Sequence, residues 1–310
     1  MYSPLHRLTA GAIAAGALLL STGSLAEPLV GLTTTHQIVL FDSLAPGMAS
    51  APVTITGTAA NERILGIDIR PSTGVLYGLG SASNLYTLDA QTGAATFVAA
   101  LMADPADVTS PFAGLVGASF GVDFNPVPDL GMTLPSLRVT SDAGINLRIN
   151  VNGAQAGRVF TDTSLAGPAG TTIVGSAYIN NDRDATTGTA LYDIDSTADA
   201  LFLQSPPNNG TLTMVGSLGV DTIGVVGFDV SGGGIAYASL TDGLTGKSGL
   251  YRIDLATGAA TGLGAFGIAG NTAIAPPLLD ISAPVPEPGT IGLMALGLTA
   301  LVGVGLRRRR

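Results

Sequence analysis

The chain has 310 residues, and its 13 basic and 22 acidic side chains give a net charge of −9 at pH 7. Without the terminal segments that we expect to be removed or held in a membrane, eight basic and 21 acidic residues remain, a net charge of −13. Such an acidic surface argues against nucleic acid as a partner, and the absence of cysteine excludes a disulfide framework.

The first 26 residues have the order of a secretory signal peptide. A weakly basic start, with His6 and Arg7, precedes an apolar run from Leu8 to Leu20. Small residues then stand at the last and third-last positions of Ser24-Leu25-Ala26, as signal peptidase requires. We therefore predict a signal helix, cleavage after Ala26 by signal peptidase, and export across the inner membrane.

Residues 27–268 are predicted to be all-β and repetitive. No stretch there has the 3.6-residue period of an amphipathic helix, whereas short β-branched runs alternate with Gly and Thr-Gly turns. The two clearest copies of the repeat are 64–96 and 225–261, which share Gly-x-Asp, a Tyr-bearing strand and Leu-Tyr-x-(Leu/Ile)-Asp. Two degenerate copies begin at 121 and 175, and a partial copy begins at 29.

One repeat of about four short strands is too small to bury both of its faces, so neighbouring repeats must stack. Radial stacking into a β-propeller achieves this and leaves only short edges. The residues that close the repeats fall at irregular intervals, which fits blades with loop insertions: Asp42, Asp89, Asn150, Asp195 and Asp254. We predict a β-propeller-like array of about five four-stranded repeats. Six blades are the alternative count, and a pair of β-sandwiches is the alternative architecture.

Side chains for catalysis are scarce. His36 is the single histidine of the exported region, and we expect an exposed residue in a polar turn, with no nucleophile elbow to accompany it. Two sets of acids recur at matching repeat positions, so we expect them to cap turns or hold loops: Asp68, Asp123 and Asp229, and the repeat-closing Asp89, Asp195 and Asp254. A carboxylate-pair glycosidase is the enzymatic alternative, because that chemistry needs only two acids at the right separation.

One segment resembles a calcium loop. Asn180, Asp182 and Asp184 place oxygen ligands at alternate positions, as calcium loops do. Ala185 stands where the turn glycine of an EF-hand belongs, and Leu191 stands where its bidentate glutamate belongs. Calcium is therefore the one cofactor that the sequence suggests, and an Asn/Asp-rich surface turn is the alternative.

The C-terminal part is predicted to contain a spacer and a membrane segment. Residues 269–284 are rich in Ala, Pro and Ser and are expected to be an extended spacer. Region 285–310 begins with Val-Pro-Glu-Pro, which cannot continue a helix. The 18 residues from Gly289 to Leu306 carry no charge and are just long enough for a transmembrane helix.

This tail resembles the PEP-CTERM sorting signal of Gram-negative envelopes. The residues that carry the resemblance are the sorting motif Pro286, Glu287 and Pro288, the apolar segment, and the cytoplasmic anchor Arg307, Arg308, Arg309 and Arg310. The resemblance implies that the tail is recognised and removed by an exosortase, a membrane-embedded transpeptidase-like protease.

The repeats resemble a propeller-like family, the domain of unknown function 4394. The resemblance spans residues 29–268 and is carried by the Gly-x-Asp strands and by the segments 85–89, 191–195 and 250–254. It implies architecture and no activity.

These features together predict an exported, exosortase-processed protein of the cell envelope or extracellular matrix. We expect the C-terminal helix to anchor it transiently before it reaches the cell surface or the medium. The expected role is a non-enzymatic binding or adhesion module associated with exopolysaccharide. The alternative role is an extracytoplasmic carboxylate-pair hydrolase.

Overall fold

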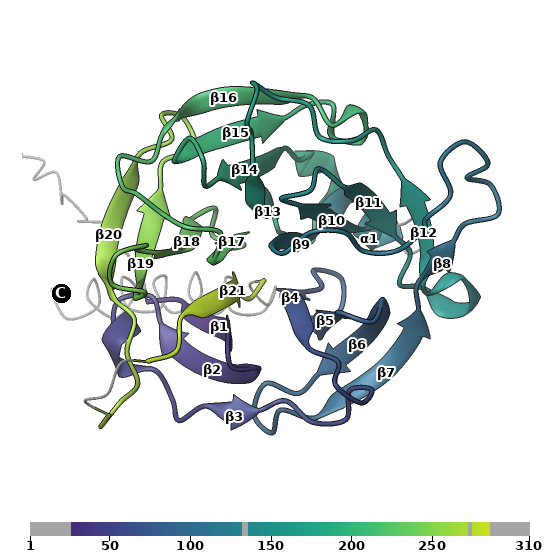
Figure 1. Ribbon diagram of the computed structural model, residues 1–310. Coiled ribbons are helices and arrows are strands. Elements are labelled where there is room, and N and C mark those ends of the chain that lie inside the picture. Colours follow the sequence, from purple (N-terminus) through teal and green to yellow (C-terminus); the bar gives the residue numbers. More distant parts are fainter. Residues whose placement is uncertain (1–25, 132–135, 272–274, 286–310) are drawn as a thin grey trace, which may run out of the picture.

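The structure is a computed structural model that describes residues 26–131, 136–271 and 275–285. Five β-sheets are arranged like blades around a central axis, as a five-bladed propeller (Figure 1). The all-β, five-blade prediction is confirmed, and the sandwich alternative is wrong. The predicted signal and C-terminal helices lie outside the described residues. Within the described ranges, no helix has the length and apolar character needed to cross a membrane.

Each blade is an antiparallel sheet whose strands follow one another outward from the axis. The first blade contains β21 (Leu278–Ser282), β1 (Pro28–Thr33), β2 (Gln37–Asp42) and β3 (Val53–Thr54). The second contains β4 (Ile64–Ile69), β5 (Leu76–Gly80), β6 (Asn84–Leu88) and β7 (Ala95–Ala100). The third contains β9 (Phe120–Phe124), β10 (Leu137–Ser141), β11 (Asn146–Ile149) and β12 (Arg158–Thr161), with β8 (Met102–Ala103) added in parallel outside β12.

The last two blades follow the same plan. The fourth contains β13 (Ile173–Tyr178), β14 (Leu191–Asp195), β15 (Ala200–Gln204) and β16 (Leu212–Ser217). The fifth contains β17 (Val226–Val230), β18 (Ala236–Thr241), β19 (Ser248–Ile253) and β20 (Ala260–Ala265). Within the described residues, the connections hold one short α-helix and four 3-10 turns: α1 (Pro126–Gly131), η1 (Pro46–Met48), η2 (Gly153–Gln155), η3 (Ala185–Thr187) and η4 (Pro207–Asn209).

The two ends of the described chain meet in the first blade. Strand β21 pairs antiparallel with β1, with Gly31 opposite Ile281, so a C-terminal segment supplies the innermost strand of the N-terminal blade. The prediction of a spacer over 269–284 is therefore wrong for residues 278–282. The Pro-rich sequence before these residues led us to expect a spacer, but they form a short strand whose side chains Leu278 and Ile281 are buried in the core.

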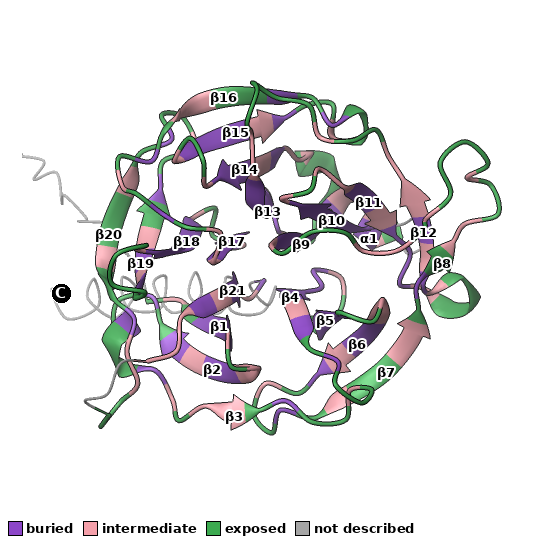
Figure 2. Cartoon of the chain, viewed as in Figure 1, coloured by how far each residue is buried: buried purple, intermediate pink, exposed green. Residues whose placement is uncertain are grey.

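Burial decreases from the axis to the rim of each blade (Figure 2). Every residue of β9, β13 and β17 is buried, because each inner strand has a neighbouring blade on both faces. Most residues of the outermost strand β20 are exposed, and those of β16 are exposed or half-buried except Leu212. This explains why the inner strands read as continuous apolar or small-residue runs and lack an alternating pattern.

Glycine allows the inner strands to approach one another closely. A Cβ placed on Gly227 of β17 would lie 2.4 Å from the backbone nitrogen of Ile281 in β21. A Cβ on Gly121 of β9 would lie 2.5 Å from the backbone nitrogen of Ser176 in β13. The Gly of the repeated Gly-x-Asp pattern is therefore required by packing at the axis.

The residues that close the repeats cap turns, as predicted for Asp89, Asp195 and Asp254. Asp89 Oδ1 accepts hydrogen bonds from the backbone N–H groups of Gln91 and Thr92. Asp254 does the same for Ala256 and Thr257. The equivalent residues of the other three blades also accept a backbone N–H two residues on: Asp42, Asn150 and Asp195. These side chains are Asx-type turn formers.

Candidate functional site

Several loops meet on one face of the propeller. In an antiparallel blade, the connections from first to second strand and from third to fourth strand leave at the same face. Helix α1 and turn η3 are first-to-second connections of the third and fourth blades, and they contact each other. Turn η4 is a third-to-fourth connection of the fourth blade. We call this side of the molecule the α1 face.

A groove of about 620 Å³ lies between the third and fourth blades at the α1 face. The third blade contributes Arg138 from β10 and Arg148 from β11, and the fourth contributes Tyr178 from β13. The remaining lining residues are mostly Asn, Ser, Thr and Pro, with one Val and one Gly: Asn125, Val127, Pro128, Ser136, Gly188, Thr189 and residues 206–209. Its size is that of pockets that hold small ligands.

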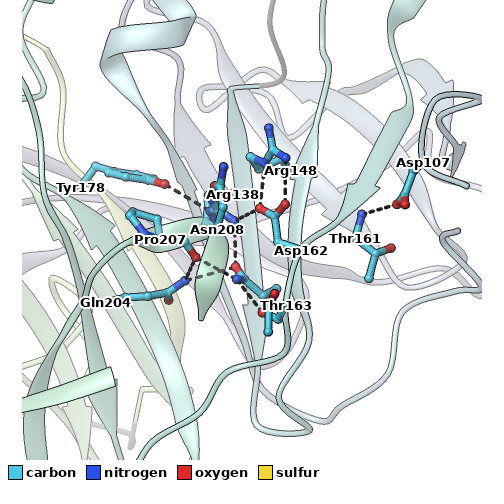
Figure 3. Close-up of polar contacts among 11 residues, drawn as sticks. Asp107, Arg138, Arg148, Thr161, Asp162, Thr163, Tyr178, Gln204, Pro207 and Asn208 are labelled. Carbon is cyan, nitrogen blue, oxygen red and sulfur yellow. Dashed lines mark hydrogen bonds and ion pairs between the residues drawn. The ribbon is translucent and has the colours of Figure 1, made fainter. Parts of the chain in front are cut away.

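Arg138 is the buried centre of this groove (Figure 3). Its Nε donates to the Tyr178 hydroxyl at 3.2 Å and its Nη2 donates to Asn208 Oδ1 at 2.7 Å, so it links the two blades. Its Nη1 donates to Asn146 Oδ1 at 2.8 Å and to Asp162 Oδ2 at 2.7 Å. The side chain is 2 % exposed, and these four acceptors compensate for its burial.

Arg148 is the accessible cation of the groove. Its Nε and Nη2 form a two-pronged ion pair with Asp162, at 2.7 and 2.8 Å, and its guanidinium lies 5.3 Å from the centre of the Phe160 ring. Its side chain is 30 % exposed, against 7 % for Asp162. One carboxylate therefore faces two guanidinium groups, which leaves an excess positive charge in a protein that is acidic overall.

This arrangement suits a polar, sugar-sized ligand. Arg148 offers charged N–H donors, and Asn125 and Asn208 offer amide groups, on a framework held by Arg138 and by the buried Tyr178 hydroxyl that it contacts. Burial raises the pKa of the Tyr178 phenol, although the Arg138 guanidinium opposes the shift, so its hydroxyl stays neutral at ordinary pH. Proline side chains from both blades give the walls rigid apolar surface.

A second polar cluster lies at the axis, where acids hold the inner strands together. The innermost strand of each blade has a free edge whose backbone groups need partners. Asp68 Oδ2 on β4 accepts from the N–H of Phe124 on β9 at 2.8 Å, and Asp229 Oδ2 on β17 accepts from the N–H of Ala283 at 2.6 Å. The sequence led us to expect that these acids cap turns or hold loops; instead they bind backbone N–H groups on or next to the inner strands of neighbouring blades.

Three of these acids also meet one another. One carboxylate oxygen each of Asp68, Asp123 and Asp229 lies within 4.8 Å of the other two, and all three residues are buried. Burial raises the pKa of each carboxyl, to about 7 for Asp229, and repulsion from neighbouring carboxylates adds to the shift for Asp68 and Asp123.

The predicted calcium loop lies in the β13–β14 connection, beside the groove. Asn180 Nδ2 donates to the carbonyl oxygens of Thr187 and Gly188, both at 3.2 Å. Asp182 Oδ1 accepts from the N–H of Asp184, whose own Oδ1 accepts from Thr186. Side-chain atoms of all three predicted ligands thus bond to the loop itself, and calcium binding there stays a prediction.

His36 differs from its prediction. It lies in the β1–β2 turn with φ of 64°, but it is half-buried, and its Nδ1 accepts the backbone N–H of Ile64 at 3.2 Å. Burial, followed by the charge of Arg63, lowers its pKa, so the ring accepts as a neutral imidazole. A half-buried turn histidine that joins the first blade to the second replaces the expected exposed one.

The residues predicted for processing are mostly outside the described ranges. Ala26 is the first described residue and is exposed. The sorting motif residues Pro286, Glu287 and Pro288 and the anchor residues Arg307, Arg308, Arg309 and Arg310 lie beyond residue 285, outside the described residues.

The groove was not predicted from the sequence, although a signal was present. Arg138 and Arg148 are two of only eight basic residues in region 27–285, and both are flanked by apolar residues within strands. A charge at such a position requires a buried partner. The partners of Arg138 include Asp162 and Asn208, which lie 24 and 70 residues further along the chain, and only the blade arrangement brings them next to it.

Comparisons with known families confirm both resemblances. The model of the domain of unknown function (DUF4394) matches residues 37–275, and the model of the PEP-CTERM protein-sorting motif matches residues 284–310. A search of curated proteins gives no match.

Two solved structures illustrate the similarity in shape. A crystal structure of a nidogen/laminin complex is 13 % identical, with a TM-score of 0.48 over 83 % of this chain and 98 % of that chain. A structural genomics protein of unknown function from Bacteroides thetaiotaomicron VPI-5482 is 13 % identical, with a TM-score of 0.46 over 84 % of this chain and 65 % of that chain.

Proposed function

This chain belongs to the DUF4394 family and carries a PEP-CTERM protein-sorting motif, and from that premise we propose that it is a non-enzymatic binding module for exopolysaccharide at the cell envelope. The motif implies an exosortase-targeted, exported protein. In our proposal, signal peptidase removes residues 1–26, and the C-terminal segment anchors the chain until the exosortase acts. The mature protein then works at the cell surface or in the matrix.

The groove at the α1 face is the observation that carries the proposal. A saccharide presents hydroxyl groups, and in many exopolysaccharides carboxylates, to which the accessible Arg148 guanidinium and the neighbouring Asn208 can hydrogen-bond. Arg138 fixes the position of Asn208 through its own hydrogen bond and is itself held by the buried Tyr178 hydroxyl. A site whose donors are held in place before binding loses less conformational entropy when the ligand arrives.

The test is the affinity of R148A for exopolysaccharide. Hydrogen bonds to charged groups contribute about 1.5–3 kcal/mol, so we expect affinity to fall at least about tenfold. The substitution should leave the fold intact, because Asp162 keeps its ion pair with Arg138. R252A is the matched control, since Arg252 is an exposed strand arginine in a different blade, and we expect it to bind like the unchanged protein.

The experiment uses exopolysaccharide from the producing cells and defined oligosaccharides with and without carboxylate groups. Calorimetry or surface plasmon resonance gives the affinities, and chromatography of the sugars after incubation reports any chain cleavage. Equal binding by R148A and the unchanged protein would refute the groove as the binding site. Release of shorter sugars would favour the carboxylate-pair hydrolase instead.

A further inference from the structure

Three acids from three different blades converge on the propeller axis. Asp68 lies on β4, Asp123 on β9 and Asp229 on β17, and each is about 1 % exposed. One oxygen of each lies within 4.8 Å of the other two. In the described residues, the ion pairs join other acids, Asp129 and Asp162, so no Lys or Arg there neutralises this cluster.

The hydrogen bonds of the cluster leave one oxygen without a donor. Both oxygens of Asp68 accept hydrogen bonds, from Ile69, Ser282 and Phe124. Both oxygens of Asp229 accept backbone N–H groups as well. Asp123 Oδ1 accepts the Tyr178 N–H at 3.0 Å, but its Oδ2 is buried and receives no N–H or hydroxyl donor among the described residues; the Asp123 side chain interacts with the Asp229 carboxyl group instead.

Packing alone does not explain such a group. A buried polar atom without a partner costs about 1–3 kcal/mol, and more when it carries charge. Three carboxylates this close also repel one another strongly in a medium of low dielectric constant. Either shared protons or a cation must compensate, and a cation would also satisfy the bare oxygen of Asp123.

We propose that Asp68, Asp123 and Asp229 bind a calcium ion on the propeller axis. Two oxygens on one ion can be no farther apart than twice the ion–oxygen distance, which is about 4.6–5.2 Å for calcium. The spacing of the three acids meets this limit. Carboxylate oxygens are the ligands that calcium prefers. Three carboxylates carry one negative charge more than the ion can neutralise, and one proton shared within the cluster would balance it.

The neighbouring strand orients the proposed ligands. Ser282 Oγ donates to Asp68 Oδ1 at 2.8 Å, and the Ala283 N–H holds Asp229. Both come from the β21 segment, so the ion would tie the second, third and fifth blades together beside the strand that closes the ring. This site is distinct from the loop of Asn180, Asp182 and Asp184, which is a connection on the α1 face.

The test must allow for slow exchange, because the proposed ligands are buried. The mature protein, purified as the cell exports it, is unfolded in denaturant with chelator and refolded with either chelator or about 1 mM calcium. We expect one calcium per chain by elemental analysis after refolding in calcium. We also expect the midpoint of thermal unfolding to rise by about 5 °C or more over the chelator sample.

Variants locate the ion. D123N keeps the shape of the side chain and its oxygen toward Tyr178, and we expect calcium affinity to fall at least about tenfold. D193N, at a buried acid outside the cluster, should bind calcium like the unchanged protein. The double variant D182N/D184N separates the two candidate sites, because it leaves the axial ligands untouched and should keep the calcium on the axis. If D123N does not fold, an anomalous-scattering peak about 2.3–2.6 Å from all three carboxylates in crystals of the unchanged protein tests the same point.

Three outcomes would overturn the proposal. The first is refolding to equal stability without any bound metal, which would mean that shared protons hold the cluster. The second is loss of calcium from D182N/D184N but not from D123N, which would place the ion in the β13–β14 loop. The third is an anomalous peak away from the axis.

Discussion

The buried acidic side chains of this propeller differ in how far hydrogen-bond donors compensate for their burial. Glu62 accepts hydrogen bonds from the Tyr86 hydroxyl at 2.5 Å, the Asn84 amide at 2.9 Å and the Ala82 N–H at 2.9 Å. Burial raises its pKa, but these donors more than offset that effect and the pKa is lowered. Asp193 is the opposite case, because its Oδ2 is buried and has no hydrogen-bond partner among the described residues.

The titration of Asp193 should therefore be visible in the stability of the protein. Burial raises its pKa to about 7, while the Ser176 hydroxyl and the Arg138 charge oppose the shift. The unfolded chain releases this proton near pH 4, but the native protein holds it up to about pH 7. Between those values the native state binds more protons, so the contribution of Asp193 to stability falls as pH rises.

Asparagine at position 193 cannot titrate, so it removes the pH-dependent loss of stability that Asp193 causes. We expect D193N to become more stable than the unchanged protein as pH rises from about 4 to about 7, by up to about 4 kcal/mol at the upper end. Denaturant unfolding across this pH range, in chelator throughout, measures the difference. Parallel curves for D193N and the unchanged protein would show that Asp193 is charged in the native state.

Glycine is required by close packing on the inner strands but not on the outer strands. Gly227 lies on the inner strand β17, where a Cβ would collide with the backbone of β21. Gly262 lies on the outer strand β20 of the same blade, where a Cβ would contact only the Tyr251 ring, at 3.6 Å. Neither has a positive φ, so alanine tests packing alone at both positions.

We expect G227A to lower the free energy of unfolding by about 2 kcal/mol or more, because backbone atoms cannot move aside as a flexible side chain can. G262A should stay within about 1 kcal/mol of the unchanged protein and gains from the lower entropy of its unfolded chain. Urea unfolding of both variants gives the comparison. A similar loss in both would mean that the inner strands have room to separate.

The difference between tightly packed inner strands and exposed outer strands also explains which elements could be predicted from the sequence. Gly-x-Asp and Leu-Tyr-x-(Leu/Ile)-Asp recur because every blade needs close packing at the axis and a capped turn, so the repeats and the blade count were predictable. Strand β21 was missed because Asp280 and Ser282 stand where three of the other four inner strands have Gly and Asp. The groove was missed because its members come from β10, β11 and η4, and no local pattern records which blades are neighbours.

At the scale of the molecule, β21 controls whether the ring is closed. It joins the C-terminal end of the described chain to β1, and it contributes the buried side chains Leu278 and Ile281. The sorting motif begins at residue 284, two residues after the strand ends. Processing in the motif therefore leaves the closing strand in place, whereas a cut only a few residues earlier would remove it.

Two shortened chains test this arrangement. A chain that ends at residue 285 should melt at the same temperature as the mature exported protein. A chain that ends at residue 276 lacks β21 and should lose cooperative unfolding or melt at least about 10 °C lower, because truncating even one buried Leu or Ile costs about 2–5 kcal/mol. Thermal unfolding followed by circular dichroism distinguishes these results.

Addition of the missing strand as a peptide gives the matched control. A peptide of residues 275–285 should restore cooperative melting of the shorter chain, because it can pair with the free edge of β1. The same peptide with Leu278 and Ile281 replaced by Asp should fail, since both side chains enter the core. If the chain ending at residue 276 melts like the longer one without any peptide, the ring is held by the other four inner strands, and closure by β21 contributes little to stability.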